Sequence, residues 1–356
     1  MTTGQKPYPF HEFFAGSGLV CQGLSDLFHS IWANDISSRK AEVYRSNFDA
    51  SVLHVKDISD VHGIDLPNAM LSWASFPCQD LSLAGNIDGI YSERSGLVWQ
   101  WMRILDELGE NAPRVVCLEN VAGLVSAHDG ENYRHLQSAL EQRGYKTGAV
   151  LINADHFVPQ SRPRVFVIGT KGRIPEDAAT DSPTWAHPTS IQAVGKTIDS
   201  FVWWNLPVPI PRKQDISDVV ENAPFDKDEV TSLIPATHIK KLEESGRKYA
   251  TGYRRTRNSK QVLELRCDGI AGCLRTPAGG SSRQYLICKD EDGLHARLLT
   301  AREVARLMGA PDSLKLPGSY NDAYFAMGDA VAVPVARFLS ENLLRDLVEA
   351  AYEIQG

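Results

Sequence analysis

The chain has 356 residues, of which 43% are hydrophobic and 23% charged, a composition typical of a globular protein of about two domains. This composition excludes collagen, intrinsic disorder and a disulfide miniprotein. No stretch reaches the ~18 uninterrupted apolar residues of a membrane helix, so we expect a soluble, cytoplasmic protein with no membrane partner. The 37 lysines and arginines against 44 aspartates and glutamates give a net charge of −7, so a nucleic-acid partner would require a local basic surface.

Between residues 9 and 169, short apolar or β-branched runs alternate with amphipathic stretches, as in the strands and crossover helices of a parallel sheet. Strands are predicted over residues 9–14, 31–34, 52–55, 70–75, 115–119, 149–152 and 165–169. Helices are predicted over residues 19–27, 38–47, 97–108 and 133–143. The pattern predicts an α/β fold with a doubly wound, mostly parallel sheet.

The character of the sequence changes after Lys171. Eight prolines punctuate residues 175–235 without a persistent period, which indicates a linker or an irregular second domain. Residues 235–260 carry eight basic and two acidic side chains, a local balance of +6. Strand character follows at residues 261–266 and 284–288, and helical periodicity returns at residues 300–307 and 331–349. We therefore expect three parts: a first domain over 1–172, a smaller irregular domain with its linker over 173–295, and a segment over 296–356 that rejoins the first.

The first predicted strand runs into the turn Phe14-Ala15-Gly16-Ser17-Gly18 and then a helix. Glycines there allow a ligand close to the backbone, and Asp35, nineteen residues past Gly16, stands where a carboxylate accepts hydrogen bonds from ribose. The third glycine of the dinucleotide fingerprint is missing, which favours a nucleoside with a small charged tail over a pyrophosphate. A turn that only packs strand against helix is the alternative.

Asp57 and Ile58, after the third predicted strand, repeat this arrangement of an acid beside an apolar residue. The pair suits the amino group and ring of adenine, and a simple helix cap is the alternative.

Six cysteines with no C-x-x-C pair predict reduced thiols rather than a disulfide framework or a metal site. Cys117 and Cys21 lie within a predicted strand and helix, where cysteines usually pack. Cys78 differs because it follows Pro77 at the end of the fourth strand, facing the crevice in which open α/β sheets bind ligands. Its position is right for a nucleophile, which needs cationic neighbours or a helix start to become a thiolate.

Further polar groups follow the next strands. Glu119 ends the fifth strand, and Arg162 and Arg164 lead into the last one. Singly, each is more often a surface group, but a thiol, a carboxylate and two guanidiniums at the ends of one sheet form a constellation of low chance occurrence.

With these residues in view, the chain resembles the DNA (cytosine-5)-methyltransferases of bacterial restriction-modification systems. The resemblance covers residues 10–170 and 295–337. It rests on motifs in the family's order, which are Phe14-Ala15-Gly16-Ser17-Gly18, Pro77-Cys78-Gln79, Glu119-Asn120-Val121, Gln160-x-Arg162-x-Arg164, Arg297-Leu298-Leu299-Thr300-x-Arg302-Glu303 and Gly328-Asp329-Ala330-Val331.

The resemblance implies methyl transfer from S-adenosylmethionine to C5 of a flipped-out cytosine, with S-adenosylhomocysteine as product. Cys78 would add to C6, because cytosine C5 is a poor nucleophile until the ring becomes an enamine. Glu119 would donate a proton to N3, Arg164 would hold O2, and Arg162 would brace the cysteine loop or share that charge.

The resemblance also implies the cofactor contacts. Asp35 would take the ribose and Asp57 the adenine amino group, and the remaining contacts would come from Phe14, Gly16, Ser17, Gly18, Ile36, Ile58, Asp329 and Val331. The family usually has Asn where Asp329 stands, and an added negative charge near the methionine carboxylate should weaken cofactor binding unless a cation offsets it. Asp329→Asn is therefore expected to keep activity and tighten binding.

Duplex DNA is the implied partner, read by residues between the Arg164 motif and Arg297. Candidate contacts with phosphates or base edges are Gln79, Ser82, Arg254, Arg255, Arg257, Arg275, Arg283 and Gln284. A cognate restriction endonuclease and a monomeric state are further expectations.

Three other functions are weighed. A nicotinamide-dependent oxidoreductase shares the glycine turn and Asp35 but leaves Cys78 and Glu119 without a role. A noncatalytic DNA-binding protein on the same fold is disfavoured by the intact catalytic set. An RNA cytosine methyltransferase is disfavoured by the long variable segment.

Overall fold

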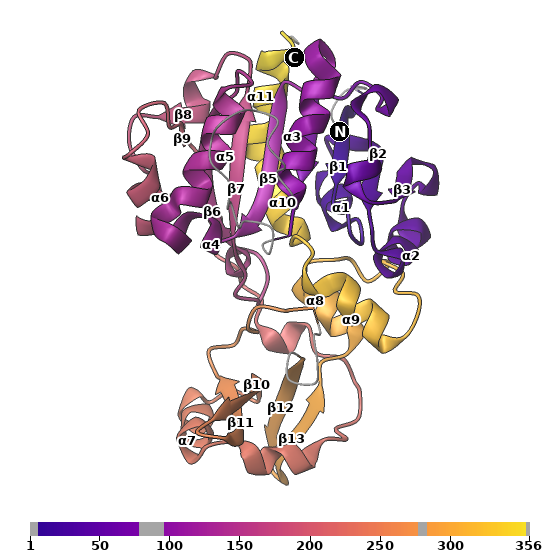
Figure 1. Cartoon of the computed structure of the whole chain (residues 1–356). Coiled ribbons are helices and arrows are strands. Elements are labelled where there is room, and N and C mark those ends of the chain that lie inside the picture. The colour runs from indigo at the N-terminus through magenta and orange to yellow at the C-terminus, as the bar shows by residue number, and fades with distance from the viewer. Residues whose placement is uncertain (1–5, 78–95, 277–282, 354–356) are drawn as a thin grey trace.

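A computed structural model describes residues 6–77, 96–276 and 283–353 (Figure 1). A seven-stranded sheet has the order β3-β2-β1-β4-β5-β7-β6, and β7 alone among these strands runs antiparallel to its neighbours. Its strands are β1 (Tyr8–Phe13), β2 (Phe28–Asp35), β3 (Leu53–Val55), β4 (Leu71–Ala74), β5 (Val115–Val121), β6 (Lys146–Asn153) and β7 (Pro163–Thr170). The prediction of a doubly wound, mostly parallel sheet is confirmed.

Helices cover both faces of this sheet. Their bounds are α1 (Leu19–Leu24), α2 (Ser38–Asn47), α3 (Leu97–Leu108), α4 (Gly123–Ser126), α5 (Glu131–Glu141), α10 (Val333–Leu339) and α11 (Arg345–Ala351). Alternate residues of β1 serve two cores: Phe10 packs with residues of α1, α10 and α11, while Phe13 packs with residues of α3 and α5. The strands are therefore buried on both faces, as parallel sheets require.

The predicted helices 38–47 and 97–108 agree with α2 and α3 at both ends. Helix α2 begins where Ser37 accepts a hydrogen bond from the Lys40 amide, which satisfies one of the unpaired amides of its first turn. Helix α1 is shorter than predicted, ending at Leu24, and the single helix predicted over 331–349 is interrupted by a π-helical turn at Ser340–Leu344.

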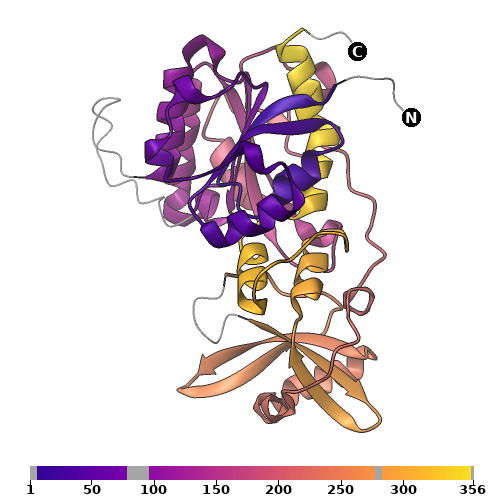
Figure 2. The same cartoon turned by 90° about the vertical axis from the view of Figure 1, so that its right-hand side faces the viewer.

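A second, antiparallel sheet has the strand order β11-β10-β12-β13 and lies apart from the large one in both views (Figures 1 and 2). Its strands are β10 (Tyr249–Arg257), β11 (Lys260–Arg266), β12 (Gln284–Asp290) and β13 (Gly293–Leu298), and α7 (Ala236–Ser245) packs beside them. The smaller second domain is thus confirmed, although sequence reasoning did not recognise β10 or β13 as strands.

The proline-rich stretch packs in part against the large sheet. It contains β8 (Ala179–Thr180), α6 (Thr189–Gly195) and β9 (Trp203–Trp204), and β8 and β9 pair as a separate two-stranded sheet. The amide of Val202 donates to Thr147 of β6, and the amide of Leu151 donates to Ala186. Residues 179–204 therefore lie against β6, the edge strand of the large sheet.

Helices α8 (Ala301–Leu307) and α9 (Tyr320–Gly328) lie between the two sheets (Figures 1 and 2). Arg297, at the end of β13, makes a buried ion pair of 2.5 Å with Glu303 of α8. Glu303 also accepts the Glu221 amide at 2.8 Å. Because an unpaired buried charge is costly, this pair fixes where the chain leaves the second sheet. No helix in the described ranges is long and apolar enough to cross a membrane.

Candidate active site

A cavity of about 510 Å³ lies at the edge of the large sheet where β1, β2, β4 and β5 end. The first residues of β7 reach the same edge because β7 runs antiparallel to β5, so that Arg164 lies opposite Val121. The cavity is lined by Phe14, Ala15, Gly16, Leu19, Val20, Asn34, Asp35, Ile36, Ser37, Lys40, Lys56, Asp57, Ile58, Ser75, Phe76, Pro77, Leu97, Glu119, Asn120, Val121, Arg164, Thr276, Phe325, Asp329, Ala330 and Val331.

The turn after β1 forms one wall of the cavity. Phe14 and Gly16 both adopt a left-handed backbone, with φ of 57° and 56°. The Gly16 amide donates to Asp35 Oδ2 at 2.8 Å, which closes the turn against the end of β2. The predicted glycine turn and its carboxylate partner are thus brought together.

Ser17 and Gly18 are not among the lining residues. The Ser17 hydroxyl is buried and donates to the Ala326 carbonyl at 2.9 Å. A Cβ at Gly18 would lie 2.4 Å from the ring of Phe48, so glycine is needed here for packing between α1 and α2. These two residues therefore pack the turn against α9 and α2.

Asp35 and Ile36 stand at the end of β2. Asp35 Oδ1 accepts the Ser37 amide at 2.7 Å, and burial raises the pKa of the Asp35 carboxyl while Lys40 opposes that shift. Ile36 lines the cavity and yet is 69% exposed, an unusual position for a large apolar side chain.

Asp57 both lines the cavity and caps a short turn. Its Oδ1 accepts the amide and the hydroxyl of Ser59 at 2.8 and 2.7 Å, and these bonds lower the pKa of the carboxyl. Ile58 is buried beside it. The predicted ligand contact and the alternative helix cap are therefore compatible.

Glu119 and Arg164 meet in the wall of the cavity. Arg164 Nε lies 3.0 Å from Glu119 Oε1, and the two side chains are 14% and 7% exposed. Burial raises the pKa of the Glu119 carboxyl, and the nearby guanidiniums of Arg164 and Arg162 act in the opposite direction. The Glu119 carboxyl therefore stays protonated to a higher pH than the carboxyl of an exposed glutamate does.

Arg162 lies behind this wall and not in it. It is 1% exposed, and its Nη1 donates to the carbonyls of Leu274 at 2.9 Å and Gly328 at 3.1 Å. Burial lowers the pKa of Arg162 to about 10. Gln160 acts beside it, accepting the Leu274 amide at 3.1 Å. Arg162 thus positions backbone from two distant parts of the chain.

Cys78, Gln79 and Ser82 fall outside the described residues. Pro77, immediately before Cys78, lines the cavity, and the residue before it is held by Asn120, whose side-chain amide donates to the Phe76 carbonyl at 2.9 Å. The chain therefore enters the Cys78 segment at the cavity.

Two of the other cysteines behave as expected of packing residues. Cys117 is fully buried, and burial raises the pKa of its thiol and that of Cys21. Both thiols therefore favour the neutral form over the nucleophilic thiolate. No group of three or more His, Cys, Asp or Glu side chains suited to hold a metal ion occurs in the described part of the chain.

Asp329 lines the cavity and is paired with a lysine. Its Oδ2 lies 2.6 Å from Lys40 Nζ. The cation needed to offset this departure from the family pattern is therefore present. Ala330 and Val331, the next residues, also line the cavity.

The arginines of the basic tract lie on β10. Arg257 pairs with Glu264 across the strand pair at 2.6 and 3.0 Å, and the guanidinium of Arg255 lies over the ring of Tyr253 at 4.7 Å. Arg254 is half-buried on the same strand.

The candidates around the glycine-rich segment separate into two groups. Arg275 is exposed, and Arg283 donates to Asn321 Oδ1 at 2.5 Å. Gln284, by contrast, is buried, and its amide bonds to both backbone groups of Gly272, at 3.0 and 2.8 Å. This side chain holds β12 in place and is not offered to a base.

Sequence reasoning missed Lys40, Thr276 and Phe325 in the cavity wall. Thr276 comes from the segment beyond β11 and Phe325 from α9. No local pattern marks them, because each reaches the cavity only through the packing of segments far apart in the chain. Lys40 is an ordinary helix residue by sequence, and its acidic partner lies 289 positions away.

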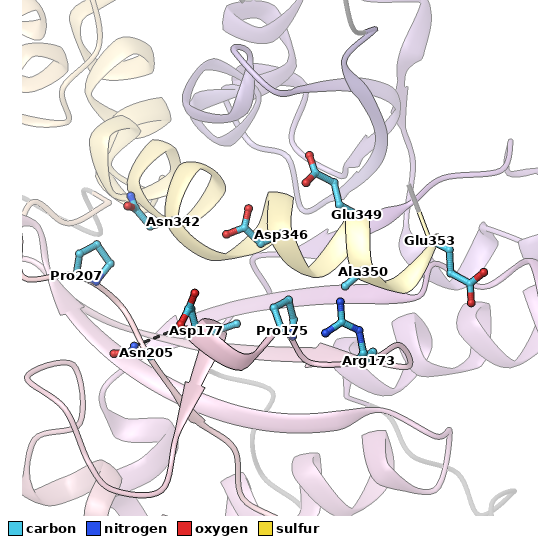
Figure 3. A pocket seen from close by; sticks show the side chains of 11 residues that line it. Arg173, Pro175, Asp177, Asn205, Pro207, Asn342, Asp346, Glu349, Ala350 and Glu353 are labelled. Atoms are coloured by element: carbon cyan, nitrogen blue, oxygen red, sulfur yellow. Dashed lines mark hydrogen bonds between the residues drawn. The ribbon is translucent and has the colours of Figure 1, made fainter. Parts of the chain in front are cut away.

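A second cavity, of about 700 Å³, lies at the opposite edge of the sheet between α11 and the segment after β7 (Figure 3). Asp346, Glu349 and Asp177 line it together with Arg173. Glu349 accepts the hydroxyl of Tyr8, the first residue of β1, which places this cavity at the amino end of the parallel strands. It brings together none of the predicted site residues.

Comparison with known proteins agrees with this geometry. A family model described as C-5 cytosine-specific DNA methylase matches residues 8–345. Type II methyltransferase M.Bsp6I of Bacillus sp. (strain RFL6) is 25% identical over 350 residues, covering 95% of this chain and 98% of the relative. Type II methyltransferase M1.ScrFI of Lactococcus lactis subsp. cremoris is 25% identical over 343 residues, covering 96% and 79%.

Solved structures share the fold. The Dnmt2 methyltransferase of S. pombe superposes with a TM-score of 0.62 at 20% identity, covering 96% of this chain and 98% of that one. The DNMT2 of Spodoptera frugiperda, solved as a mutant, gives a TM-score of 0.63 at 19% identity, covering 96% and 99%.

Proposed function

The chain belongs to the C-5 cytosine-specific DNA methylase family, and we propose how its own residues methylate carbon 5 of a cytosine in duplex DNA. The observation that carries the proposal is the buried Glu119–Arg164 pair. It lies in one cavity with the Asp35 carboxylate and beside the entry to the Cys78 segment. One cavity thus holds both a nucleoside-binding acid and an acid–guanidinium pair for a base.

The residues present fit S-adenosylmethionine. Asp35 is placed for ribose hydroxyls, Asp57 for the adenine amino group, and Phe14, Ile36 and Ile58 supply apolar surface for the ring. When bound, the cofactor supplies a methyl group on a sulfonium, and S-adenosylhomocysteine remains as product. The exposed Ile36 would be covered by the adenine.

Glu119 and Arg164 prepare the base. Cys78 forms a bond to C6 of the cytosine while Glu119 gives its proton to N3, so that the ring electrons reach C5. Arg164, already bonded to one Glu119 oxygen, holds O2 and leaves the other oxygen for N3. After methylation, the C5 proton passes to a base, the N3 proton returns to Glu119 and the Cys78 sulfur departs as a thiolate, which restores the aromatic ring.

The second sheet supplies the DNA surface in this proposal. Arg254, Arg255 and Arg257 on β10 contact phosphates, and the residues nearest the large domain, Arg275 and Arg283, reach base edges. Gln79 and Ser82 contact DNA from the Cys78 segment, which must face the flipped cytosine. Gln284 does not contact DNA in this proposal, because its side chain is buried.

We further infer the molecular context. Residues 1–172 bind cofactor and base, 173–295 contain the linker and the domain that recognises the target, and 296–356 lead the chain back. The protein acts as a cytoplasmic monomer. It protects a sequence from a cognate restriction endonuclease, a role that the Type II names of its relatives support.

The experiment is incubation with methyl-labelled S-adenosylmethionine and either duplex DNA or RNA, followed by nucleoside analysis. We expect 5-methylcytosine in DNA with wild type and with Cys267→Ala, a cysteine of the second sheet, and none with Cys78→Ala. Equal labelling by Cys78→Ala would exclude the covalent step. Label in RNA alone would change the substrate, and DNA binding without label would indicate a noncatalytic protein.

A trapping experiment tests the same bond directly. In a duplex with 5-fluorocytosine at the target, the fluorine at C5 cannot leave as a cation in the way that the C5 proton does. The adduct with Cys78 should therefore persist on a denaturing gel. Glu119→Gln should form this adduct far more slowly.

A further inference from the structure

Lys40 and Asp329 form an ion pair inside the cavity. Lys40 comes from α2 and Asp329 follows α9, and the 2.6 Å bond between Nζ and Oδ2 joins them. Both residues line the cavity, and the Lys40 side chain is only 14% exposed. The ammonium is therefore held at the ligand site and is not a solvated surface charge.

Packing fixes where this ammonium lies. The Lys40 chain runs over the glycine turn, with its Cδ 3.7 Å from the position that a Cβ of Gly16 would take. Its Nζ lies 5.5 Å from the centre of the Phe325 ring. Three neighbours thus confine the ammonium to the space between the turn after β1 and Asp329.

The rest of the cavity is chemically accounted for by the proposed function. Asp35 and Asp57 serve the nucleoside, and Glu119 with Arg164 serves the base. The cofactor also carries an amino acid tail, whose carboxylate needs a cation or several donors. Lys40 lies next to Asp35, since the Gly16 turn that it covers is bonded to that carboxylate.

We propose that Lys40 binds the carboxylate of the cofactor's amino acid tail and that Asp329 holds the Lys40 ammonium in position. An ammonium has three N–H donors, and the bond to Asp329 leaves capacity for a carboxylate. Before the cofactor enters, Asp329 balances the Lys40 charge, which keeps the cavity from attracting other anions. The inference rests on S-adenosylmethionine being the cofactor, as proposed above.

The test compares two ligands by calorimetric titration. S-Adenosylhomocysteine carries the amino acid tail, and 5′-methylthioadenosine lacks it. Lys40→Met keeps the aliphatic packing over Gly16 but removes the charge. The matched control is Arg39→Met, which removes a charge from the neighbouring residue of α2, a residue that pairs with Asp322 outside the cavity.

We expect Lys40→Met to weaken S-adenosylhomocysteine binding at least about tenfold, because bonds to charged groups are among the strongest. Its binding of 5′-methylthioadenosine should stay within about twofold of wild type, which also shows that the variant is folded. Arg39→Met should match wild type with both ligands.

The other outcomes distinguish a wrong role for Lys40 from a wrong assignment of the cofactor. Equal loss of both ligands, or loss of neither, overturns the role of Lys40 while the proposed function stands. A variant that binds S-adenosylhomocysteine normally but loses duplex DNA would assign Lys40 to a phosphate instead. Failure of wild type to bind either ligand would refute the cofactor assignment itself.

Discussion

Replacing Glu12, which lies near the turn after β1, by glutamine is expected to remove a loss of stability that wild type undergoes as the pH rises. Glu12 sits near the end of β1 and is fully buried. Its Oε1 accepts the Cys21 amide at 3.3 Å, and its Oε2 has no partner among the described residues. Burial, reinforced by the Asp35 charge, raises the pKa of Glu12 from 4.5 to about 8.

The direction in which stability changes with pH follows from the number of protons that the folded and unfolded states bind. At neutral pH the folded protein keeps Glu12 protonated, whereas the unfolded chain ionises it above pH 4.5. The stability contributed by the neutral carboxyl is therefore complete below pH 4.5 and is lost as the pH rises to about 8. Because the slope is at most about 1.4 kcal/mol per pH unit and falls off near each pKa, the loss between these limits is about 4 kcal/mol, a large share of a typical folding free energy.

Glutamine has the shape of the protonated acid and does not ionise. The free energy of unfolding of Glu12→Gln should equal that of wild type near pH 4.5 and exceed it by about 4 kcal/mol at pH 8. Urea denaturation at several pH values measures this difference. Groups that are not coupled to Glu12, such as buried His11, contribute equally to both proteins and cancel. A difference that does not change with pH would refute the reasoning.

Three further predictions concern the site. Glu119→Gln should lower the rate of methyl transfer by about 10² to 10⁴ with DNA binding retained, and the wild-type rate should fall as rising pH ionises the raised-pKa Glu119 carboxyl; a flat pH–rate profile would contradict the acid role. Gly328→Ala places a Cβ 2.6 Å from backbone at residues 275–276 and should cost about 1–3 kcal/mol in urea denaturation, whereas Gly123→Ala, with its nearest neighbour at 3.6 Å, should be nearly neutral. Asp329→Asn should keep activity and tighten S-adenosylhomocysteine binding, because an amide oxygen can still accept a hydrogen bond from Lys40 while the negative charge that competes for the lysine is removed; weaker binding in a titration would contradict this.

Much of the catalytic half of the fold could be predicted from local pattern. Helix α2 has a capping serine, Ser37, and α3 has a strong amphipathic periodicity, and both were predicted at their observed bounds. Strand β10 was not predicted, because its alternating Tyr, Arg and Thr residues indicate a basic surface more readily than a strand. Charge is visible in sequence, whereas the strands that pair with both edges of β10 are not.

The site residues likewise include some whose position could be predicted from sequence and some whose position could not. Glu119, Arg164 and Asp35 lie at strand ends that meet on one side of the sheet, so the topology of an open sheet brings them together without any knowledge of side-chain contacts. Gln284 was interpreted as a base contact because it stands beside the glycine-rich segment. In the structure its side chain is buried and bonds to the backbone of Gly272, a pairing that no local pattern indicates. Polar residues that satisfy distant backbone resemble surface residues in a sequence.

Arg162 and Arg164 belong to one sequence motif but have different positions in the structure. It is two residues from Arg164, and both approach the same edge of the sheet, yet only Arg164 lines the cavity. The guanidinium of Arg162 instead joins the Leu274 carbonyl, in the segment between β11 and β12, to the Gly328 carbonyl, which precedes Asp329 of the cavity. A buried charge in that position is costly unless both carbonyls remain in place, so it penalises any movement of one segment without the other. In the proposed function Arg162 therefore holds the segment after β11 against the cofactor-binding wall, whereas Arg164 contacts the base.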